Sequence, residues 1–399
     1  MKNILFITKL KPLEKGNKGP NGLVWTLYDT LKKNDQYNID LFYIDVLKEG
    51  KSKRWFFDQL DILGLRSYDI NVNWNRYDYI LVYPDTTILS VPKNVRSKVI
   101  VLAPDATSMA RLSKWKSYAN NRTSSLIKKL YQYIFYKRFI SFERKYVPQV
   151  RSYLVVGRTD RRWIRFHLGK EYWDKVVFLP HPCIESALVD LYANHINISK
   201  HKRFVFSGDM SYSYVGENIL GLKAGFDSIA PLKKLDILIV GGNNKWIYDL
   251  LSKSTYLNVT YLKWVEDYQD ICRVGRDVHC IPLIAGAGTK NRVLTALANS
   301  LEIISTPKGV ENISISRLSH VHVKKQMYSF AEQMYKTSLQ SYTDKEILAL
   351  IQEREKFRME VKSAFLGTLY KTLTGVCQVK CVSFFRYHKR RCVTSDCWL

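Results

Sequence analysis

The sequence has no run of apolar residues long enough to cross a bilayer, so no membrane-spanning helix is expected. Its first residues, MKNILFITKL, hold too short an apolar stretch for a secretory signal and are predicted to form a buried strand. Three of its seven cysteines are scattered through the body of the chain, which excludes the disulfide framework of a small secreted domain. These absences predict a cytoplasmic protein.

Acidic residues are also scarce, with 36 Asp and Glu against 62 Lys and Arg, and the formal net charge is +26. Such an excess favours a polyanionic partner: nucleic acid, an anionic membrane surface or a phosphorylated substrate. Much of the charge lies at 111–165, where Lys and Arg are interleaved with Trp, Tyr and Phe. This mixture is typical of a surface that lies on anionic lipid, although a solvated helix face explains it almost as well. No nucleic-acid-binding motif accompanies it, so nucleic acid is not an expected partner.

Short apolar runs alternate with helix-patterned stretches, which is typical of βαβ units around parallel sheets. The polar stretch 189–202 separates two such series. The sequence therefore predicts an α/β fold with two Rossmann-like domains that face each other across a cleft. The predicted parts are an N-terminal domain at 1–188, a C-terminal domain at 203–343, a helix packing back across both at 344–375, and a tail at 376–399.

The tail holds the other four cysteines, at spacings CxxxC and CxxxxC rather than the paired CxxC of zinc ribbons. A disordered or foreign extension is therefore favoured over a metal site, and no function is assigned to the tail. No DxD-type metal clamp stands near a predicted strand end, where Asp85 is alone. No metal or other cofactor is expected.

The segment 281–313 is the most informative part of the chain. It reads as a buried strand, a glycine-rich turn, a helix, a second buried strand and a loop with a carboxylate. Gly286 and Gly288 allow close backbone approach, and Thr289 can cap the helix. Lys290 and Arg292 in its first turn oppose the helix dipole, so an anion such as a diphosphate is the expected ligand. The alternative is an ordinary βαβ turn with exposed basic residues.

Several motifs occur in a characteristic order. They are GPNG at 19–22, PDATS at 104–108, FSGDM at 206–210, WVED at 264–267, PLIAGAGTKNRVLTA at 282–296 and STPKGVEN at 305–312. In this order they resemble the motifs of GT-B glycosyltransferases of the retaining family-four type, over about residues 1–375. The resemblance implies a GT-B fold and transfer of a sugar from a nucleotide-sugar donor.

The resemblance also implies roles for single residues. Lys290 and Arg292 would neutralise the departing diphosphate, assisted by backbone amides of Gly288 and Thr289, and Glu311 would accept hydrogen bonds from the donor. Asp105, at the end of a strand, would orient or deprotonate the acceptor hydroxyl, although capping the following helix is as good an explanation. His181 at the hinge is expected to be structural. The remaining implied positions are Gly208, Gly286 and Ala287 on the donor side and Gly19, Asn21 and Gly22 in an acceptor-side loop.

Two departures from the family pattern bear on function. The family's Glu in its L-E-A segment is Thr295 here, and no basic residue follows the first strand of the second domain near Asp209. They leave a non-catalytic protein that binds a nucleotide sugar or supports a partner enzyme as an alternative. The favoured hypothesis is a metal-independent glycosyltransferase with a glycan or lipid-linked acceptor, acting in bacterial capsule, O-antigen or other surface polysaccharide synthesis. It would lie peripherally on the inner face of the plasma membrane through residues 111–165.

Overall fold

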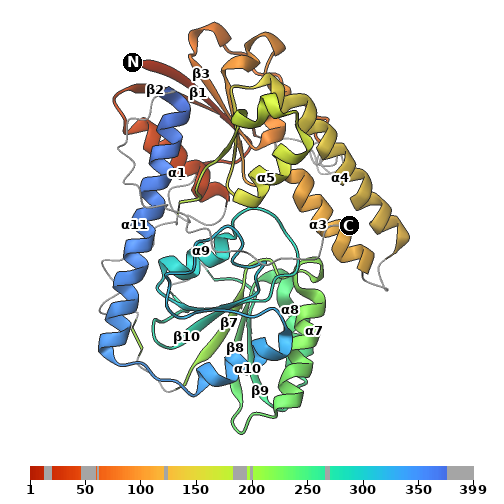
Figure 1. The fold of residues 1–399 in the computed structure, drawn as a ribbon, viewed down its shortest axis with the longest axis vertical. Coiled ribbons are helices and arrows are strands. Elements are labelled where there is room, and N and C mark those ends of the chain that lie inside the picture. The colour runs from red at the N-terminus through yellow and green to blue at the C-terminus, as the bar shows by residue number, and fades with distance from the viewer. Residues whose placement is uncertain are drawn as a thin grey trace.

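The computed structural model describes residues 1–12, 20–45, 60, 63–120, 125–182, 196–197, 201–265 and 270–374. These residues form two lobes that follow each other along the long axis, each built around one sheet, as Figure 1 shows. Within this part of the chain, no helix is both long enough and apolar enough to span a membrane. The predicted tail at 376–399 and the predicted boundary at 188 lie outside the described residues.

The N-terminal lobe has a six-stranded sheet in the order β2-β1-β3-β4-β5-β6, and every neighbouring pair is parallel. Its central strands are continuous runs of Val, Ile and Leu because helices cover both faces of the sheet. The strands are β1 (Lys2–Thr8), β2 (Tyr37–Tyr43), β3 (Tyr79–Tyr83), β4 (Val99–Ala103), β5 (Ser152–Val155) and β6 (Val176–Phe178).

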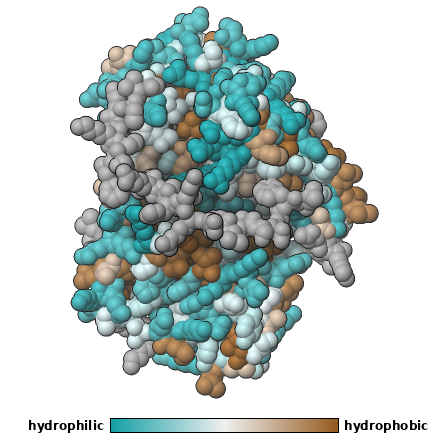
Figure 2. Space-filling model, viewed as in Figure 1, coloured by the Kyte–Doolittle hydropathy of each residue, from teal (hydrophilic) through white to brown (hydrophobic). Residues whose placement is uncertain are grey.

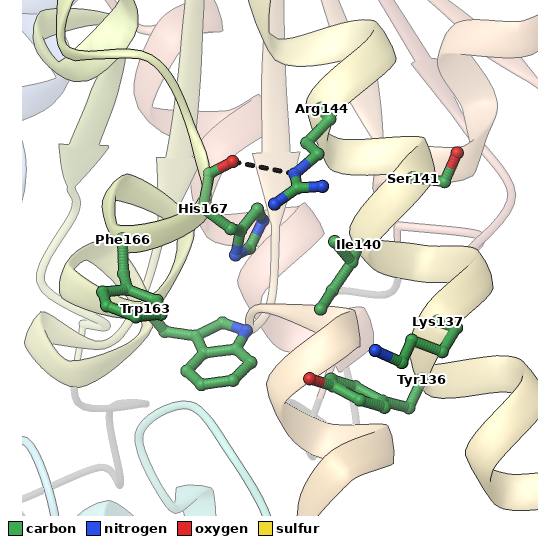
Figure 3. Close-up of a pocket in the computed structure, with 8 residues that line it drawn as sticks. All are labelled: Tyr136, Lys137, Ile140, Ser141, Arg144, Trp163, Phe166 and His167. Atoms are coloured by element: carbon green, nitrogen blue, oxygen red, sulfur yellow. Dashed lines mark hydrogen bonds between the residues drawn. The ribbon is translucent and has the colours of Figure 1, made fainter.

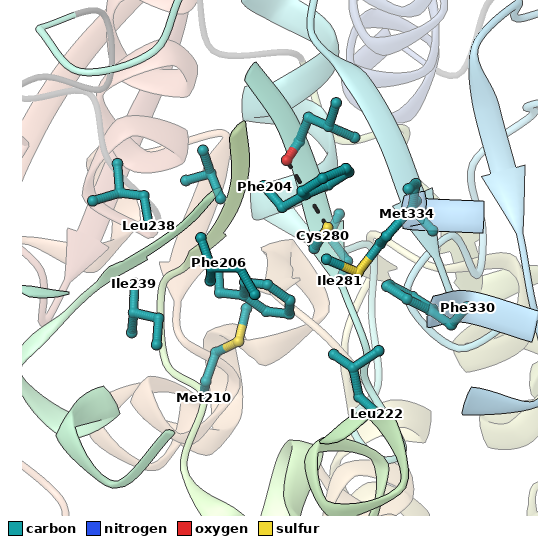
Figure 4. Packing of buried hydrophobic residues seen from close by; sticks show 14 of the residues in the cluster. Phe204, Phe206, Met210, Leu222, Leu238, Ile239, Cys280, Ile281, Phe330 and Met334 are labelled. Carbon is teal, nitrogen blue, oxygen red and sulfur yellow. Dashed lines mark hydrogen bonds between the residues drawn. The ribbon is translucent and has the colours of Figure 1, made fainter. Parts of the chain in front are cut away.

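The C-terminal lobe repeats this architecture with six parallel strands in the order β12-β11-β10-β7-β8-β9. Phe204, Phe206, Cys280 and Ile281 of its central strands pack into one buried cluster with side chains from the covering helices, as Figure 4 shows. The strands are β7 (Arg203–Ser207), β8 (Leu235–Val240), β9 (Leu257–Leu262), β10 (Asp277–Ile281), β11 (Glu302–Ser305) and β12 (Val321–Val323).

The helices of the N-terminal lobe are α1 (Pro20–Lys32), α3 (Thr107–Asn120), α4 (Leu126–Tyr146) and α5 (Arg158–His167). Those of the C-terminal lobe are α7 (Tyr212–Ile229), α8 (Lys245–Leu251), α9 (Asn291–Ala298) and α10 (Met327–Ser338). Short 3-10 turns lie at Trp74–Arg76, Asp85–Ser90, Lys93–Lys98, Val147–Gln149, Lys170–Lys175 and Gly242–Asn244.

The long helix α11 (Asp344–Thr374) contacts both lobes. Ile347 and Ile351 in its first half join a small apolar cluster with Val274, next to the C-terminal sheet. Phe365 and Leu369 in its second half join the core of the N-terminal lobe. Figure 1 shows α11 in blue along one side of the molecule, so this helix connects the two lobes in addition to the segment between their sheets.

Two local expectations are wrong. Asn21 and Gly22, predicted in a loop, belong to the first turn of α1, which begins at Pro20 because the fixed backbone angle of proline suits that position. Thr289 does not cap α9, because Lys290 occupies the N-cap position and the helix begins at Asn291. The short strand β12 was not predicted, since three residues are too few for a pattern.

Candidate active site

The loop between β10 and α9 lies against the N-terminal lobe. Gly286 and Gly288 both have positive φ, at 123° and 67°, which only glycine adopts easily. The Gly286 amide donates to the Ser113 hydroxyl of α3 at 2.9 Å. A Cβ on Gly288 would lie 3.0 Å from the carbonyl oxygen of Pro104 and 3.0 Å from Cβ of Asp105. The loop that was predicted to bind a diphosphate therefore forms the contact between the lobes.

Lys290 is buried at this contact, with 9% of its side chain exposed. Its ammonium donates to the carbonyl oxygens of Ala287 at 2.6 Å and Gly288 at 2.9 Å, so the side chain folds back over the loop. Burial and, to a lesser extent, neighbouring Lys308 lower the pKa of Lys290 to about 8, against the opposing carboxylate of Glu311. The side chain is thus a buried cation whose hydrogen-bond partners are neutral carbonyls, with the Glu311 carboxylate 4.0 Å away.

Glu311 stands between two cations. Its Oε2 lies 2.6 Å from the ammonium of Lys308 and 4.0 Å from that of Lys290. Lys308 was not named from the sequence, although it stands three residues before Glu311 in the STPKGVEN motif. The two lysines and the carboxylate leave one net positive charge beside the start of α9.

Arg292 joins the first turn of α9 to the end of β7. Its Nη2 donates to the carbonyl oxygen of Asp209 at 2.7 Å. Gly208 has a φ of 84°, and a Cβ there would lie 3.5 Å from the guanidinium carbon of Arg292. The structure therefore brings Gly208 and Arg292 together, while Arg292 is only partly buried.

Asp105 follows β4 and lies on the N-terminal side of the same contact. Burial and, to a lesser extent, the charge of Asp160 raise the pKa of its carboxyl to about 7, against the opposing charges of Lys290 and Arg111. No described residue donates a hydrogen bond to this carboxylate. The capping alternative is therefore not supported, since the amides of Ala106 and Ser108 at the start of α3 donate to Asp160 at 2.8 Å and Glu143 at 3.1 Å.

Asp160 links the two lobes and was not predicted from the sequence. It lies in the first turn of α5, is fully buried, and accepts hydrogen bonds from the amides of Ala106 at 2.8 Å and Gly288 at 3.0 Å. The Gly288 amide, which the family resemblance directs at the donor, is therefore directed at a carboxylate of the other lobe. The only sequence signal is an acidic residue three positions after Gly157, where a buried strand enters a helix.

Asn312 forms a second link beside Asp160. Its Oδ1 accepts hydrogen bonds from the amide and the hydroxyl of Thr159, both at 3.0 Å, and its Nδ2 donates to the Gly288 carbonyl oxygen at 3.1 Å. The hydroxyl of Thr289 donates to the carbonyl oxygen of Val156. Thr289 therefore also contacts the N-terminal lobe, and its hydroxyl does not face a donor site in this structure.

The remaining predicted residues lie as follows. Gly19 is outside the described residues, and Asn21 and Gly22 begin α1, where the Gly22 carbonyl accepts from the Thr26 hydroxyl at 2.8 Å. His181 is buried, and its Nδ1 lies 2.8 Å from the Pro182 carbonyl oxygen. Burial lowers the pKa of His181 to about 4, so the ring is neutral at pH 7.

Asp85 is held by its surroundings and not directed at the lobe contact. Its carboxylate accepts hydrogen bonds from the Tyr153 hydroxyl at 2.9 Å and the Thr107 hydroxyl at 3.2 Å. Over the ranges that the structure describes, no group of three or more His, Cys, Asp or Glu side chains is placed to hold a metal ion.

No protein-family model matches the sequence, and no curated protein matches it. Solved structures do match the fold. The chain is similar to the N-terminal domain of trehalose-6-phosphate phosphatase from Candida albicans, with a TM-score of 0.56 at 9% identity, covering 94% of this chain and 97% of that one. It is also similar to WaaG, a glycosyltransferase involved in lipopolysaccharide biosynthesis, with a TM-score of 0.54 at 12% identity, covering 93% and 100%.

A third similar structure is HepE from Anabaena in complex with UDP-glucose, with a TM-score of 0.52 at 10% identity, covering 94% and 100% of the two chains. The predicted fold class is confirmed, since the chain has the GT-B fold with two Rossmann-like lobes. At these identities the likeness shows the fold alone, and one fold hosts many activities.

Proposed function

We propose that the protein is a glycosyltransferase that moves a sugar from a nucleotide-sugar donor to a glycan or lipid-linked acceptor. The observation that carries this proposal is the burial of Lys290 at the lobe contact, at the N-cap of α9 and opposite the carboxyl of Asp105. A buried ammonium beside a helix N-terminus is well suited to an incoming diphosphate, because both the charge and the free amides favour an anion.

On the donor side, the diphosphate would replace the Ala287 and Gly288 carbonyls as the partner of Lys290. Exchanging neutral acceptors for an anionic one strengthens the hydrogen bonds of a buried ammonium. Arg292 and Lys308 stand close enough to this helix start to share the charge, and Glu311 would accept hydrogen bonds from the donor sugar or ribose. Because these cations stabilise the leaving group, the proposed mechanism is metal-independent.

On the acceptor side, Asp105 would accept the proton of the attacking hydroxyl. A general base works best when its pKa lies near the operating pH, and the value of about 7 for Asp105 meets this condition. The retaining stereochemistry is carried over from the family resemblance as part of the proposal.

A non-catalytic protein that binds a nucleotide sugar or supports a partner enzyme is the second candidate. Thr295 stands on α9 where the family has Glu, so one contact to the donor is missing or moved. The Gly288 amide is already engaged by Asp160, which also leaves the donor fewer partners.

Release of nucleoside diphosphate from the donor distinguishes the glycosyltransferase from the non-catalytic protein. Incubation with a panel of nucleotide sugars, starting with UDP-glucose, should release the nucleoside diphosphate, and Lys290→Met should lower the release by about 100-fold, as loss of a preorganised charge does. Lys253→Met removes an exposed lysine of the same lobe and serves as the control. Donor binding without release in any acceptor mixture would favour the non-catalytic candidate.

We further propose that the protein acts at the inner face of a bacterial plasma membrane, in surface polysaccharide synthesis. Helix α4 exposes an apolar patch near its start, where Leu126 and Ile127 are each 80% exposed. We call the following residues the α4 patch: Leu126, Ile127, Leu130, Tyr131, Tyr133 and Ile134. Exposed Lys128 and half-buried Lys129 lie among them, and apolar side chains next to lysines are suited to an anionic lipid surface.

Figure 2 shows hydrophobic side chains at the right-hand edge of the molecule, where Figure 1 places the tip of α3 and α4. Cosedimentation with phosphatidylcholine vesicles containing phosphatidylglycerol tests this surface. Wild-type protein should bind, and Ile127→Asp with Leu130→Asp should lower binding at least about tenfold, because both charges would enter the apolar layer. Equal binding of wild type and double variant would contradict the proposal.

A further inference from the structure

A cavity of about 350 Å³ lies between α4 and α5 in the N-terminal lobe, apart from the lobe contact. Figure 3 shows Tyr136, Lys137 and Arg144 of α4 on one side of it and Trp163 and His167 of α5 on the other. No role described above uses this cavity. Its walls combine cations with aromatic rings, which suits a ligand that has an anionic group and an apolar or polyol part.

The cations at the cavity have no carboxylate partner. Arg144 donates from Nε to the carbonyl oxygen of His167 at 2.9 Å, and its Nη atoms form no ion pair with a described residue. The ammonium of Lys137 lies 5.5 Å from the ring centroids of Tyr133 and Tyr136 and likewise has no described carboxylate within ion-pair distance. A planar guanidinium held at one nitrogen keeps a fork of donors for a phosphate.

His167 is placed at the base of the cavity. Its side chain is only 4% exposed, its Nε2 lies within ion-pair distance of Oε2 of Glu143, at 2.8 Å, and neither ring nitrogen makes a hydrogen bond of good geometry with a described residue. The charge of Glu143 is already shared, because Ser108 donates to it from its amide at 3.1 Å and from its hydroxyl at 2.6 Å. A buried imidazole nitrogen without a partner is costly unless a ligand supplies one.

The cavity lies on the same face of α4 as the α4 patch. Residues three or four apart share one face of a helix. On α4, a row of side chains at this spacing lines the face that points away from the core. Phe135, Phe139 and Phe142 on the opposite face are buried. The outer stripe is Leu126, Leu130, Tyr133, Lys137, Ile140 and Arg144, so it begins apolar and ends at the cations of the cavity.

We propose that this cavity binds the phosphate head group of an anionic membrane lipid. The inference rests on the proposed membrane association and deepens it by naming the site. Arg144 and Lys137 would hold the phosphate, His167 would contribute its Nδ1, and Trp163 would cover the glycerol part, while the α4 patch enters the apolar layer beside it.

A short-chain lipid below its micelle concentration tests the cavity without a membrane. Dihexanoylphosphatidylglycerol should bind the full-length protein in calorimetry, and Lys137→Gln with Arg144→Gln should weaken binding at least about tenfold, since charge-assisted phosphate contacts are lost. Lys11→Gln with Lys93→Gln removes the same charge from exposed positions elsewhere in the N-terminal lobe and should change the affinity less than about twofold. His167→Gln keeps a donor for Glu143 and should also weaken binding.

Glycerol 3-phosphate and inorganic phosphate, which carry the phosphate without acyl chains, are titrated as comparison ligands. If they bind as tightly as the lipid, the site takes a free phosphate and the lipid assignment is overturned. If the two double variants bind dihexanoylphosphatidylglycerol with equal affinity, the cavity is not the binding site, because the overall positive charge of the lobe then accounts for the binding. The Ile127→Asp, Leu130→Asp variant should keep dihexanoylphosphatidylglycerol binding while losing vesicles, so failure of membrane association and failure of the cavity give different results.

Discussion

At the scale of single residues, the candidate site is defined by two titratable groups with shifted pKa values in opposite lobes. Burial raises the pKa of Asp105 to about 7 and lowers that of Lys290 to about 8. Each charge opposes the other's shift, although Asp160 affects the pKa of Asp105 more than Lys290 does, and Lys308 and Glu311 affect the pKa of Lys290 more than Asp105 does. The charged forms of both are needed for the proposed reaction, one as base and one as partner of the diphosphate.

This pair predicts a bell-shaped pH dependence of kcat/KM for sugar transfer. Activity should rise with pH through about 7 as Asp105 ionises and fall above about 8 as Lys290 loses its proton. Asp105→Asn should remove the acidic limb and lower the rate by about 100-fold or more. An acidic limb that persists unchanged in Asp105→Asn would show that another group is the base.

At the scale of structural elements, the turn between β10 and α9 is held by three groups of the N-terminal lobe. Asp160 accepts a hydrogen bond from the Gly288 amide, the Ser113 hydroxyl accepts one from the Gly286 amide, and the Val156 carbonyl accepts one from the Thr289 hydroxyl. Because the turn both joins the lobes and begins α9, donor binding and lobe contact are coupled in the proposed mechanism.

Gly288→Ala tests this coupling. The left-handed backbone alone costs about 1–2 kcal/mol for a residue with a Cβ. The new Cβ would in addition lie 3.0 Å from the Pro104 carbonyl oxygen, so the segment around Pro104 has to shift by a few tenths of an ångström. We expect a lower melting temperature than that of wild type.

Gly242→Ala is the matched control, since a Cβ at Gly242 would meet nothing within 4 Å. If Gly288→Ala lowers the melting temperature no more than this control does, the close contact of the turn with the N-terminal lobe does not contribute to stability.

The elements themselves were largely predictable, and their contacts were not. Strands such as β4 and β8 consist mostly of Val, Ile and Leu because the sheets are covered on both faces, and this pattern is visible in the sequence. The glycines and cations around Lys290 were likewise visible as a motif. Asp160 was missed because its partner Gly288 is 128 positions away, and nothing local distinguishes it from an acidic residue of an ordinary helix start.

At the scale of the whole molecule, buried histidines set the response to acid. Burial lowers the pKa of His181 to about 4 and that of His279 to about 3. Above pH 6.5 these rings are neutral in the folded and unfolded states alike and have no effect. As the pH falls below 6.5 the unfolded chain binds protons that the folded chain does not, so stability is lost.

Each such histidine should lower the free energy of unfolding by about 1.4 kcal/mol per pH unit within this window. Asp105 acts in the opposite sense, because its raised pKa makes the folded state bind a proton first. The measurement is therefore the free energy of urea unfolding of wild type and of His181→Asn, compared at pH 6.5 and at pH 5. The variant should lose less stability, and parallel losses in both proteins would show that His181 is not a buried neutral ring.

The central claim is that Lys290 holds the diphosphate of a nucleotide at the contact between the lobes. Calorimetric titration of wild type, Lys290→Met and Lys253→Met with a panel of nucleoside diphosphates, UDP first, tests it directly. We expect one diphosphate to bind wild type and Lys253→Met equally and to bind Lys290→Met at least about tenfold more weakly, a loss of about 1.4 kcal/mol. Equal affinity of all three proteins for that diphosphate would contradict it.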